Sequence, residues 1–164
     1  MIRPGAAALL LALLVALSSV VLPGRAQPLQ VLPGHASAPG AAVDEYRLKA
    51  AILYNLTKFV EWPPTAFGDS SAPLVLCIIG IDPFGPLLDD ALRGHTVGGR
   101  PLVVRRTAEA AGGCHLLFIA NSERRRLATI IDQLRKTAAL TVGDIEDFID
   151  QRGMIGLSTE GDRV

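Results

Sequence analysis

A series of short, wholly apolar runs separated by helical segments constrains the fold of this chain most. The clearest run, residues 73–80, reads PLVLCIIG, and such a run is typical of a strand buried on both faces in a parallel sheet. Four further strands are expected at residues 100–106, 114–120, 140–143 and 154–157. Helices are expected between them. The alternation predicts an α/β domain, a three-layer α/β/α sandwich with a mainly parallel sheet of about five strands.

The expected helices are recognised by apolar residues that recur every three or four positions. Four are expected, at residues 44–62, 83–93, 123–136 and 145–151. In the first, Tyr46, Ala50 and Leu53 belong to the apolar stripe, whereas Lys49 lies off the stripe or at its edge. The three arginines at 124–126 would lie in the first turn of the third helix, where the helix dipole disfavours cations. Their position indicates a solvated or partner-facing surface.

The start of the chain has the three parts of a secretory signal peptide. Arg3 gives it a positive charge, residues 6–22 are uncharged, and small residues precede a cleavage site after Ala26. Residues 1–26 are therefore expected to direct export, with an uncleaved N-terminal anchor as the alternative. Residues 27–42, rich in proline and alanine, are expected to form a flexible linker, and residues 43–164 a single domain.

Charge and hydropathy argue against two classes of partner. The 16 lysines and arginines balance 16 aspartates and glutamates, so there is no electrostatic reason to expect nucleic acid as a partner. No apolar stretch after the leader is long enough to span a bilayer, and we expect a mature chain that does not cross the membrane.

The chain has two cysteines, Cys77 and Cys114. An even count in an exported chain indicates a disulfide bond. The alternative is two separate buried thiols, because cysteine behaves as a small hydrophobic residue.

Signatures of catalysis are missing from the sequence. It has no G-x-G-x-x-G, no phosphate-binding P-loop and no G-x-S-x-G motif, and its three histidines are not spaced as metal ligands. His115 opens an apolar run and is expected to be a hydrogen-bonded structural residue. We therefore expect a protein that is not an enzyme, with no catalytic residue, no cofactor and no metal site.

Two aspartates, Asp82 and Asp144, each follow an expected strand. Ligands of open α/β sheets bind beyond the carboxyl ends of the strands, so both carboxylates could belong to a ligand crevice. The alternative is that each side chain caps a helix, for which aspartate is among the preferred residues, and capping is the favoured interpretation.

Several stretches of the chain together resemble one family. They are EYRLKAAILYN at residues 45–55, KFVEWP at 58–63, LCIIGIDPFG at 76–85, CHLLFI at 114–119, LTVGD at 140–144 and GMI at 153–155. In this order they resemble the YfiR-like family of periplasmic repressors. The similarity extends from about residue 44 to residue 158, and the first stretch is its most specific part.

The resemblance implies a non-catalytic periplasmic regulator of α/β/α fold. It implies that the protein binds the periplasmic sensor region of an inner-membrane diguanylate cyclase and represses it, which lowers cyclic di-GMP signalling and biofilm formation. Members are often dimeric, so a homodimer is also expected. The family further implies that Cys77 and Cys114 form a structural disulfide. A second hypothesis is a small-molecule-binding sensory domain that serves another membrane sensor, such as a histidine kinase.

Two departures from the family are visible. A second cysteine pair nearer the C-terminus does not occur in this sequence. The family also usually continues beyond residues 161–163 with a further strand and a closing helix. The sequence therefore leads us to expect a domain that is truncated at its C-terminus and lacks these two elements.

Overall fold

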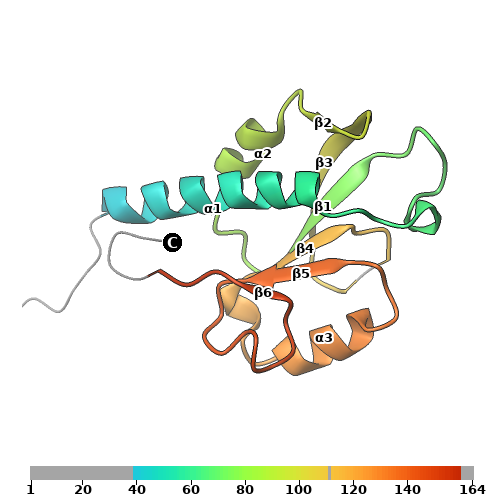
Figure 1. Ribbon diagram of the computed structural model, residues 1–164. Coiled ribbons are helices and arrows are strands. Elements are labelled where there is room, and N and C mark those ends of the chain that lie inside the picture. Colours follow the sequence, from blue (N-terminus) through green and yellow to red (C-terminus); the bar gives the residue numbers. More distant parts are fainter. Residues whose placement is uncertain (1–38, 111, 160–164) are drawn as a thin grey trace, which may run out of the picture. The chain divides into compact units, whose positions relative to one another are not determined.

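The computed structural model describes residues 39–110 and 112–159 (Figure 1). The expected signal peptide at residues 1–26 and most of the expected linker lie outside this part of the chain. The last four residues of that linker, 39–42, already belong to helix α1, which spans Pro39–Phe59. The helix was expected at residues 44–62; it ends earlier because Pro63 and Pro64 disfavour helical geometry in the residues before them.

The sheet has six strands in the order β2-β3-β1-β4-β5-β6. They are β1 (Leu74–Ile79), β2 (Thr96–Val97), β3 (Arg100–Thr107), β4 (Leu116–Ile119), β5 (Leu140–Gly143) and β6 (Ile155–Gly156). All pairs are parallel except β2 with β3. The α/β class and the mainly parallel sheet are thus confirmed, with one strand more than expected, whereas the regular three-layer sandwich stays a prediction.

The additional strand, β2, forms a hairpin with β3. Val97 pairs with Arg100, so the loop between them is the dipeptide Gly98-Gly99. Both glycines have a positive φ, 57° and 77°, and two such residues in a row make the tight turn that matches the twist of antiparallel strands.

The third and the fourth expected helices also differ from the structure. Helix α3 spans only Leu127–Leu134 and follows a 3₁₀ turn at Asn121–Glu123. The arginines at 124–126 therefore lie before the helix, and the expectation that they occupy its first turn is wrong. The expected helix at residues 145–151 is also wrong: this segment forms hydrogen-bonded turns, and the left-handed φ of Asp147, 59°, is incompatible with a continuous helix.

Helices contact both faces of the sheet, and each contact has its own hydrophobic cluster. Odd-numbered residues of β1 share a cluster with α3; its members include Val75, Cys77, Ile79, Leu117, Ile119, Leu127, Ile130, Leu134 and Phe148. Even-numbered residues share a cluster with α1 and with α2 (Pro86–Leu92); its members include Ala50, Leu53, Leu76, Ile78, Phe84, Leu88, Leu116, Phe118 and Val142. Both faces of β1 and β4 are buried, which explains why their sequences are continuously apolar.

Among the described residues, no helix has the length and apolarity that a membrane span requires.

Candidate functional site

The two cysteines form a disulfide. Cys77 lies in the middle of β1 and Cys114 two residues before β4, with their Cα atoms 5.7 Å apart. Both side chains belong to the cluster under α3. The expected pairing is confirmed, and the alternative of two separate thiols is wrong. The bond ties the central strand to the loop that crosses it between β3 and β4.

Asp82 anchors the loop that follows β1. Its Oδ1 accepts a hydrogen bond from the backbone N–H of Phe84 at 2.8 Å, and its Oδ2 lies 2.7 Å from Nε of Arg106 on β3. The same guanidinium also bonds Asp89 of α2 and the carbonyl oxygen of Gly85. The bond from Arg106 holds the pKa of Asp89 below its usual value. Asp82 therefore joins its loop, α2 and β3.

The strand order reverses at β1, because the chain passes from β1 to β3 on one side and then to β4 on the other. Such a reversal is where open α/β sheets bind ligands. Here Ser122 Oγ accepts a hydrogen bond from the N–H of Ile81 at 2.9 Å, and a Cβ atom on Gly80 would lie only 2.4 Å from this oxygen. The side chain of Ser122 thus occupies the space directly beside Gly80.

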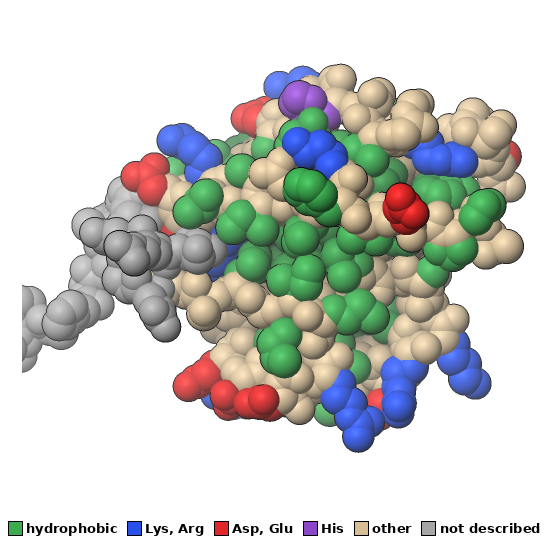
Figure 2. All heavy atoms as spheres, in the orientation of Figure 1, with side chains coloured by type: hydrophobic (Ala, Val, Ile, Leu, Met, Phe, Trp, Pro, Cys, Tyr) green, Lys and Arg blue, Asp and Glu red, His purple; other side chains and the backbone are tan. Residues whose placement is uncertain are grey.

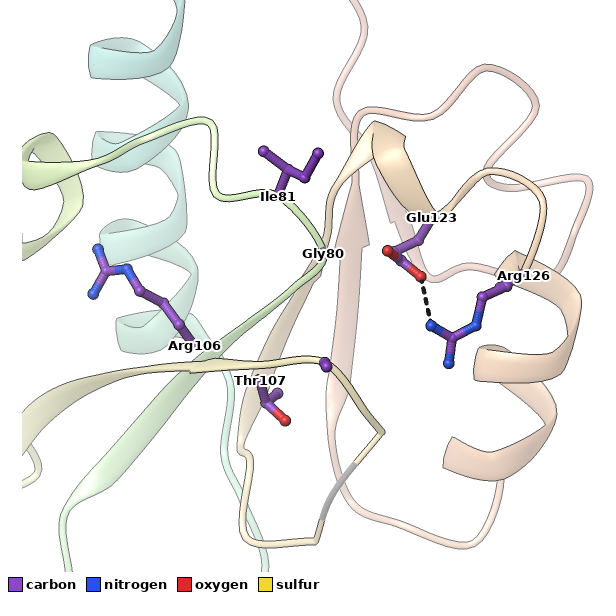
Figure 3. A pocket seen from close by; sticks show the side chains of 7 residues that line it. Gly80, Ile81, Arg106, Thr107, Glu123 and Arg126 are labelled. Atoms are coloured by element: carbon purple, nitrogen blue, oxygen red, sulfur yellow. Dashed lines mark hydrogen bonds and ion pairs between the residues drawn. The ribbon is translucent and has the colours of Figure 1, made fainter.

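A pocket of about 370 Å³ lies beside this point (Figure 3). It is lined by Gly80, Ile81, Arg106, Thr107, Ala108, Glu123 and Arg126. Figure 3 shows Arg106 on one side and the bonded Glu123–Arg126 pair on the other. Arg126 also reaches Glu109 at 3.3 Å, and Arg106 is bonded to two aspartates. Both arginines already have carboxylate partners, which weakens the pocket as an anion site.

Asp144, directly after β5, is the centre of a buried polar network. Its side chain is 4% exposed, and Oδ2 accepts hydrogen bonds from Lys49 Nζ at 3.0 Å and from the Tyr46 hydroxyl at 2.9 Å. Lys49 Nζ also lies 2.6 Å from Oε1 of Glu45, and the Thr159 hydroxyl donates to the same oxygen. The network joins the first half of α1 to β5 and to the chain after β6.

One oxygen of this network is left without a partner. Asp144 Oδ1 is buried and accepts no hydrogen bond from any of the described residues. An unsatisfied buried acceptor costs about 1–3 kcal/mol of desolvation free energy. The carboxylate is therefore bonded on one side and has unused capacity on the other.

The ionisation states of the network follow from its contacts. Burial, followed by the hydrogen bond to Asp144, raises the pKa of Tyr46 well above its usual value, so the phenol remains a donor. The hydrogen bond from Lys49 lowers the pKa of Glu45. At neutral pH Glu45 is thus ionised, and the Tyr46 phenol keeps its proton.

A second pocket, of about 390 Å³, lies beside Asp144 and is called the Asp144 pocket below. It is lined by Glu45, Tyr46, Lys49, Asn121, Asp144, Ile145, Glu146, Leu157, Ser158 and Thr159. Asp82 is not among these residues, because β4 separates the strands that carry the two aspartates. The structure does not bring Asp82 and Asp144 into one crevice, and a ligand there stays a prediction.

The expectation that Lys49 lies off the apolar stripe or at its edge is wrong, because its side chain is buried. The available signal was its spacing: Lys49 follows Tyr46 by three residues and precedes Leu53 by four, as a core position does. A lysine at such a position needs a buried acid as a partner. The sequence alone does not identify Asp144, 95 residues away, as that acid.

Apolar side chains gather on the face between α1 and β6 (Figure 2). We define the α1–β6 patch by five members of one hydrophobic cluster and by Phe59, which follows Leu56 by three residues and so lies on the same side of α1. The five cluster members are Leu56, Trp62, Leu140, Ile155 and Leu157. Phe59 is 82% exposed and the other five are half-buried. The backbone N–H of Leu140 and Trp62 Nε1 both donate to the carbonyl oxygen of His115, which places these two residues together. An exposed apolar patch with aromatic residues is typical of a protein-binding surface.

Comparison with known proteins agrees with the resemblance found in the sequence. No curated protein matches the chain. The model of the YfiR/HmsC-like family matches residues 46–164, from the first half of α1 to the last residue of the sequence. The matched segment contains both cysteines, the Asp144 network except Glu45, and the whole α1–β6 patch. This chain therefore belongs to the YfiR/HmsC-like family.

Proposed function

We propose that this protein is a non-catalytic periplasmic regulator that binds the periplasmic sensor region of an inner-membrane diguanylate cyclase and holds the cyclase inactive. The observation that carries the proposal is the family match over residues 46–164. The disulfide supports an oxidising compartment, because such bonds persist in the periplasm and are rare in the cytosol. Regulation from this side of the membrane lowers cyclic di-GMP without contact with the messenger itself.

Export is part of this proposal. Cleavage after Ala26 would leave Gln27 as the first residue of the mature chain. N-terminal sequencing of the protein from a periplasmic extract tests this, and a chain that still begins with Met1 in the membrane fraction argues for an uncleaved anchor.

The α1–β6 patch is the surface that we assign to the cyclase. Aromatic side chains dominate the binding free energy of many protein interfaces, and the patch offers Phe59 and Trp62. Its other border is the short edge strand β6, whose outer side has no neighbouring strand among the described residues. A segment of the partner could pair with this edge while apolar side chains cover the patch.

Repression requires that the regulator bind the inactive form of the cyclase more tightly than the active form. A tenfold change in the ratio of inactive to active cyclase needs a difference of only about 1.4 kcal/mol between the free energies of binding to the two forms. This is within the range of one or two buried apolar contacts. Binding to such a patch can therefore supply the free energy that repression requires, and no catalytic step is needed.

Capture from inner membranes tests the partner. The oxidised mature chain, immobilised and exposed to detergent-solubilised inner membranes, should retain a diguanylate cyclase. Phe59→Ser should abolish retention. Ile81→Ser is the matched control, since Ile81 is 78% exposed but lies outside the patch. Recovery of no membrane sensor by the wild-type chain would contradict the proposal, and recovery of only a second copy of the chain would assign the patch to a homodimer.

A second candidate function is a small-molecule-binding sensory domain that serves another membrane sensor, such as a histidine kinase. The Asp144 pocket favours it, because charged and polar side chains of α1, of the loop after β5 and of the chain after β6 line a space large enough for a small ligand. The two functions are compatible if the ligand tunes the regulator.

A further inference from the structure

The chain between α1 and β1 is held to the sheet by contacts with residue 115 (Figure 1). We call residues 60–68 the Trp62 segment. Trp62 Nε1 donates to the carbonyl oxygen of His115 at 3.0 Å, and the ring of Phe67 stacks on the imidazole with the centroids 4.4 Å apart. The 3₁₀ turn of the segment, Pro64–Ala66, has no buried residue. A segment with so little buried surface can open locally while the rest of the domain stays folded.

Contacts outside the segment limit the extent of such an opening. On its C-terminal side, Arg100 Nη1 donates to the carbonyl oxygens of Asp69 and Ala72, at 2.9 Å and 2.6 Å. The disulfide ties β1 to the residue that precedes His115. The chain after the segment and the start of β4 therefore keep their positions when the contacts between the segment and His115 break.

The imidazole makes these contacts in its neutral form. Its Nδ1 accepts a hydrogen bond from the backbone N–H of Val75 at 3.0 Å, so the ring proton is on Nε2. Nε2 is buried and has no hydrogen-bond partner among the described residues. A second proton can only go to Nδ1, where the N–H of Val75 already points. Protonation therefore replaces a hydrogen bond by two opposed donors.

No carboxylate compensates for a positive charge on this ring. β1 and β5, whose backbone N–H groups bond residue 115, contain no charged residue. The acids of the chain between α1 and β1 are Glu61 and Asp69. Neither bonds the ring, because Nδ1 is bonded to Val75 and Nε2 has no partner in the described part of the chain.

The charges that act on the ring are positive. Arg100 and Arg105 of β3 both disfavour a proton on His115. The ring of Phe67 cannot offset this as a cation–π partner, since the guanidinium of Arg100 already lies over it, 3.8 Å from its centre. Burial lowers the pKa of the imidazole more than a contact with the Ala66 backbone raises it, and the two arginines lower it further. The assembled contact therefore holds the imidazole neutral.

We propose that protonation of His115 detaches the Trp62 segment, so that this contact is an acid-operated switch in a domain that stays folded. Only the detached state takes up the proton, at the usual histidine pKa of about 6.5. The ratio of detached to attached chain should therefore rise about thirtyfold between pH 7.5 and pH 5.0. Because Trp62 belongs to the α1–β6 patch, detachment also removes an aromatic contact from the surface that we assign to the cyclase. That consequence rests on the proposed function, whereas the detachment is a property of the isolated protein.

Hydrogen exchange of the purified, oxidised mature protein tests the detachment without a cyclase. The sequence has one tryptophan, so the indole N–H of Trp62 gives a single assignable resonance. Its protection factor, corrected for the intrinsic exchange rate, should fall about thirtyfold from pH 7.5 to pH 5.0. At both pH values it should be lower than the protection factors of the amides of the central strand β4. Protection that does not change with pH, or that equals the protection of β4, would overturn the proposal.

Two variants assign the proton to its residue. His115→Asn keeps an acceptor close to the position of Nδ1 but does not titrate, so the Trp62 protection should be the same at both pH values. Hydrogen bonds from Ser71 hold the pKa of Asp69 below its usual value, so Asp69→Asn should retain the fall. A folded His115→Asn protein that still shows the fall overturns the proposal. If this variant does not fold, Val75 decides in the wild type: its N–H must lose protection over the same pH range as the Trp62 indole, and a loss at Trp62 alone contradicts the proposal.

Discussion

Lys49 and Asp144 are an ion pair whose two side chains are 3% and 4% exposed. Removing two charges from water costs several kcal/mol, and only the attraction and hydrogen bonds within the network offset this cost. The pair therefore contributes little net stability as a whole, but the loss of one partner leaves the other charge buried and uncompensated. This asymmetry makes the network sensitive to single substitutions.

Lys49→Met tests this asymmetry. The substitution keeps an unbranched side chain, yet leaves the Asp144 charge without its ammonium partner, and we expect a loss of about 3–5 kcal/mol in the free energy of unfolding. Urea denaturation measures it. In the control, Arg93→Met breaks the exposed pair with Asp90, and the loss should be no more than about 1 kcal/mol. Equal losses for the two variants would show that burial of Lys49 has no energetic consequence.

His115 is a buried histidine that the fold keeps neutral, as its expected structural role requires. The side chain is 4% exposed, and its Nδ1 accepts a hydrogen bond from the N–H of Val75 at 3.0 Å. The ring stacks on Phe67 with the centroids 4.4 Å apart. Burial lowers the pKa of His115, and the positive charges of Arg100 and Arg105 lower it further. A proton on Nδ1 would break the bond to β1.

The stability of the protein should therefore fall as the pH drops below about 6.5, the usual pKa of histidine. Below that value the unfolded chain takes up a proton at residue 115 that the folded chain excludes, with a slope of at most about 1.4 kcal/mol per pH unit. Glu45 and Asp89 have lowered pKa values, and their contribution to stability is lost only below about pH 4.5. The pH range in which His115 changes the stability is therefore separate from theirs.

Urea denaturation between pH 5 and pH 8, at closely spaced values, measures this slope. His115→Asn, whose amide oxygen lies close to the position of the imidazole Nδ1 and can still accept the Val75 bond, should remove most of it. A wild-type slope that persists in the His115→Asn variant would assign the pH dependence to another group.

At the scale of elements, the turn after β5 is fixed by one aromatic ring. Phe148 lies between Gly143 and Gly153, where added Cβ atoms would approach its ring carbons to 2.4 Å and 2.1 Å. No side chain larger than hydrogen fits at either position without moving the ring. The left-handed conformation of Asp147 places the ring of Phe148 in this space. A continuous helix over residues 145–151 would not place it there.

Gly153→Ala should consequently destabilise the protein by about 1–3 kcal/mol, because the extra methyl group overpacks the site. Thermal unfolding measures the effect. Gly156→Ala is a matched control, since its Cβ would lie 3.4 Å from the nearest atom, on Ile149, in nearly ordinary contact. If the two substitutions lower the stability equally, close packing around Phe148 does not determine the structure of this turn.

The disulfide stabilises the domain by restricting the unfolded chain. Its cysteines are 37 positions apart, and the loop-entropy model gives about 4 kcal/mol for a loop of this length. The double variant Cys77→Ala/Cys114→Ala should be less stable than the oxidised protein by about that amount in urea denaturation. Dithiothreitol should destabilise the wild type but not the double variant. An unchanged midpoint for the wild type in reductant would contradict this role.

The strands were predictable from the sequence to a greater extent than the turns and the site. β1 and β4 are buried on both faces, and double-sided burial produces the continuous apolar runs that predicted them. The start of α3 was not predictable, because the preceding turn depends on the contact of Ser122 with Ile81, 41 residues away. In the same way, burial of Lys49 depends on an acid at the other end of the domain. Local periodicity carries no information on such long-range polar contacts.

At the scale of the whole molecule, α1 links the two surfaces to which we assign a role. Its first half supplies Glu45 and Lys49 to the Asp144 pocket, and its last turns supply Leu56 and Phe59 to the α1–β6 patch. The Thr159 hydroxyl, bonded to Glu45, connects the chain after β6 to the same helix. A ligand in the pocket and a partner on the patch would therefore act on the same pair of elements, which is the physical basis for coupling between them.

The most direct test of the central claim is the level of cyclic di-GMP in cells of the source organism that lack this protein. The account predicts that deletion raises the level, and that the wild-type chain and Ile81→Ser restore it. Phe59→Ser should fail to restore it although the protein remains folded, because substitution of an exposed residue changes stability by no more than about 0.5 kcal/mol. An unchanged level after deletion, or full restoration by Phe59→Ser, would contradict repression of a cyclase through the α1–β6 patch.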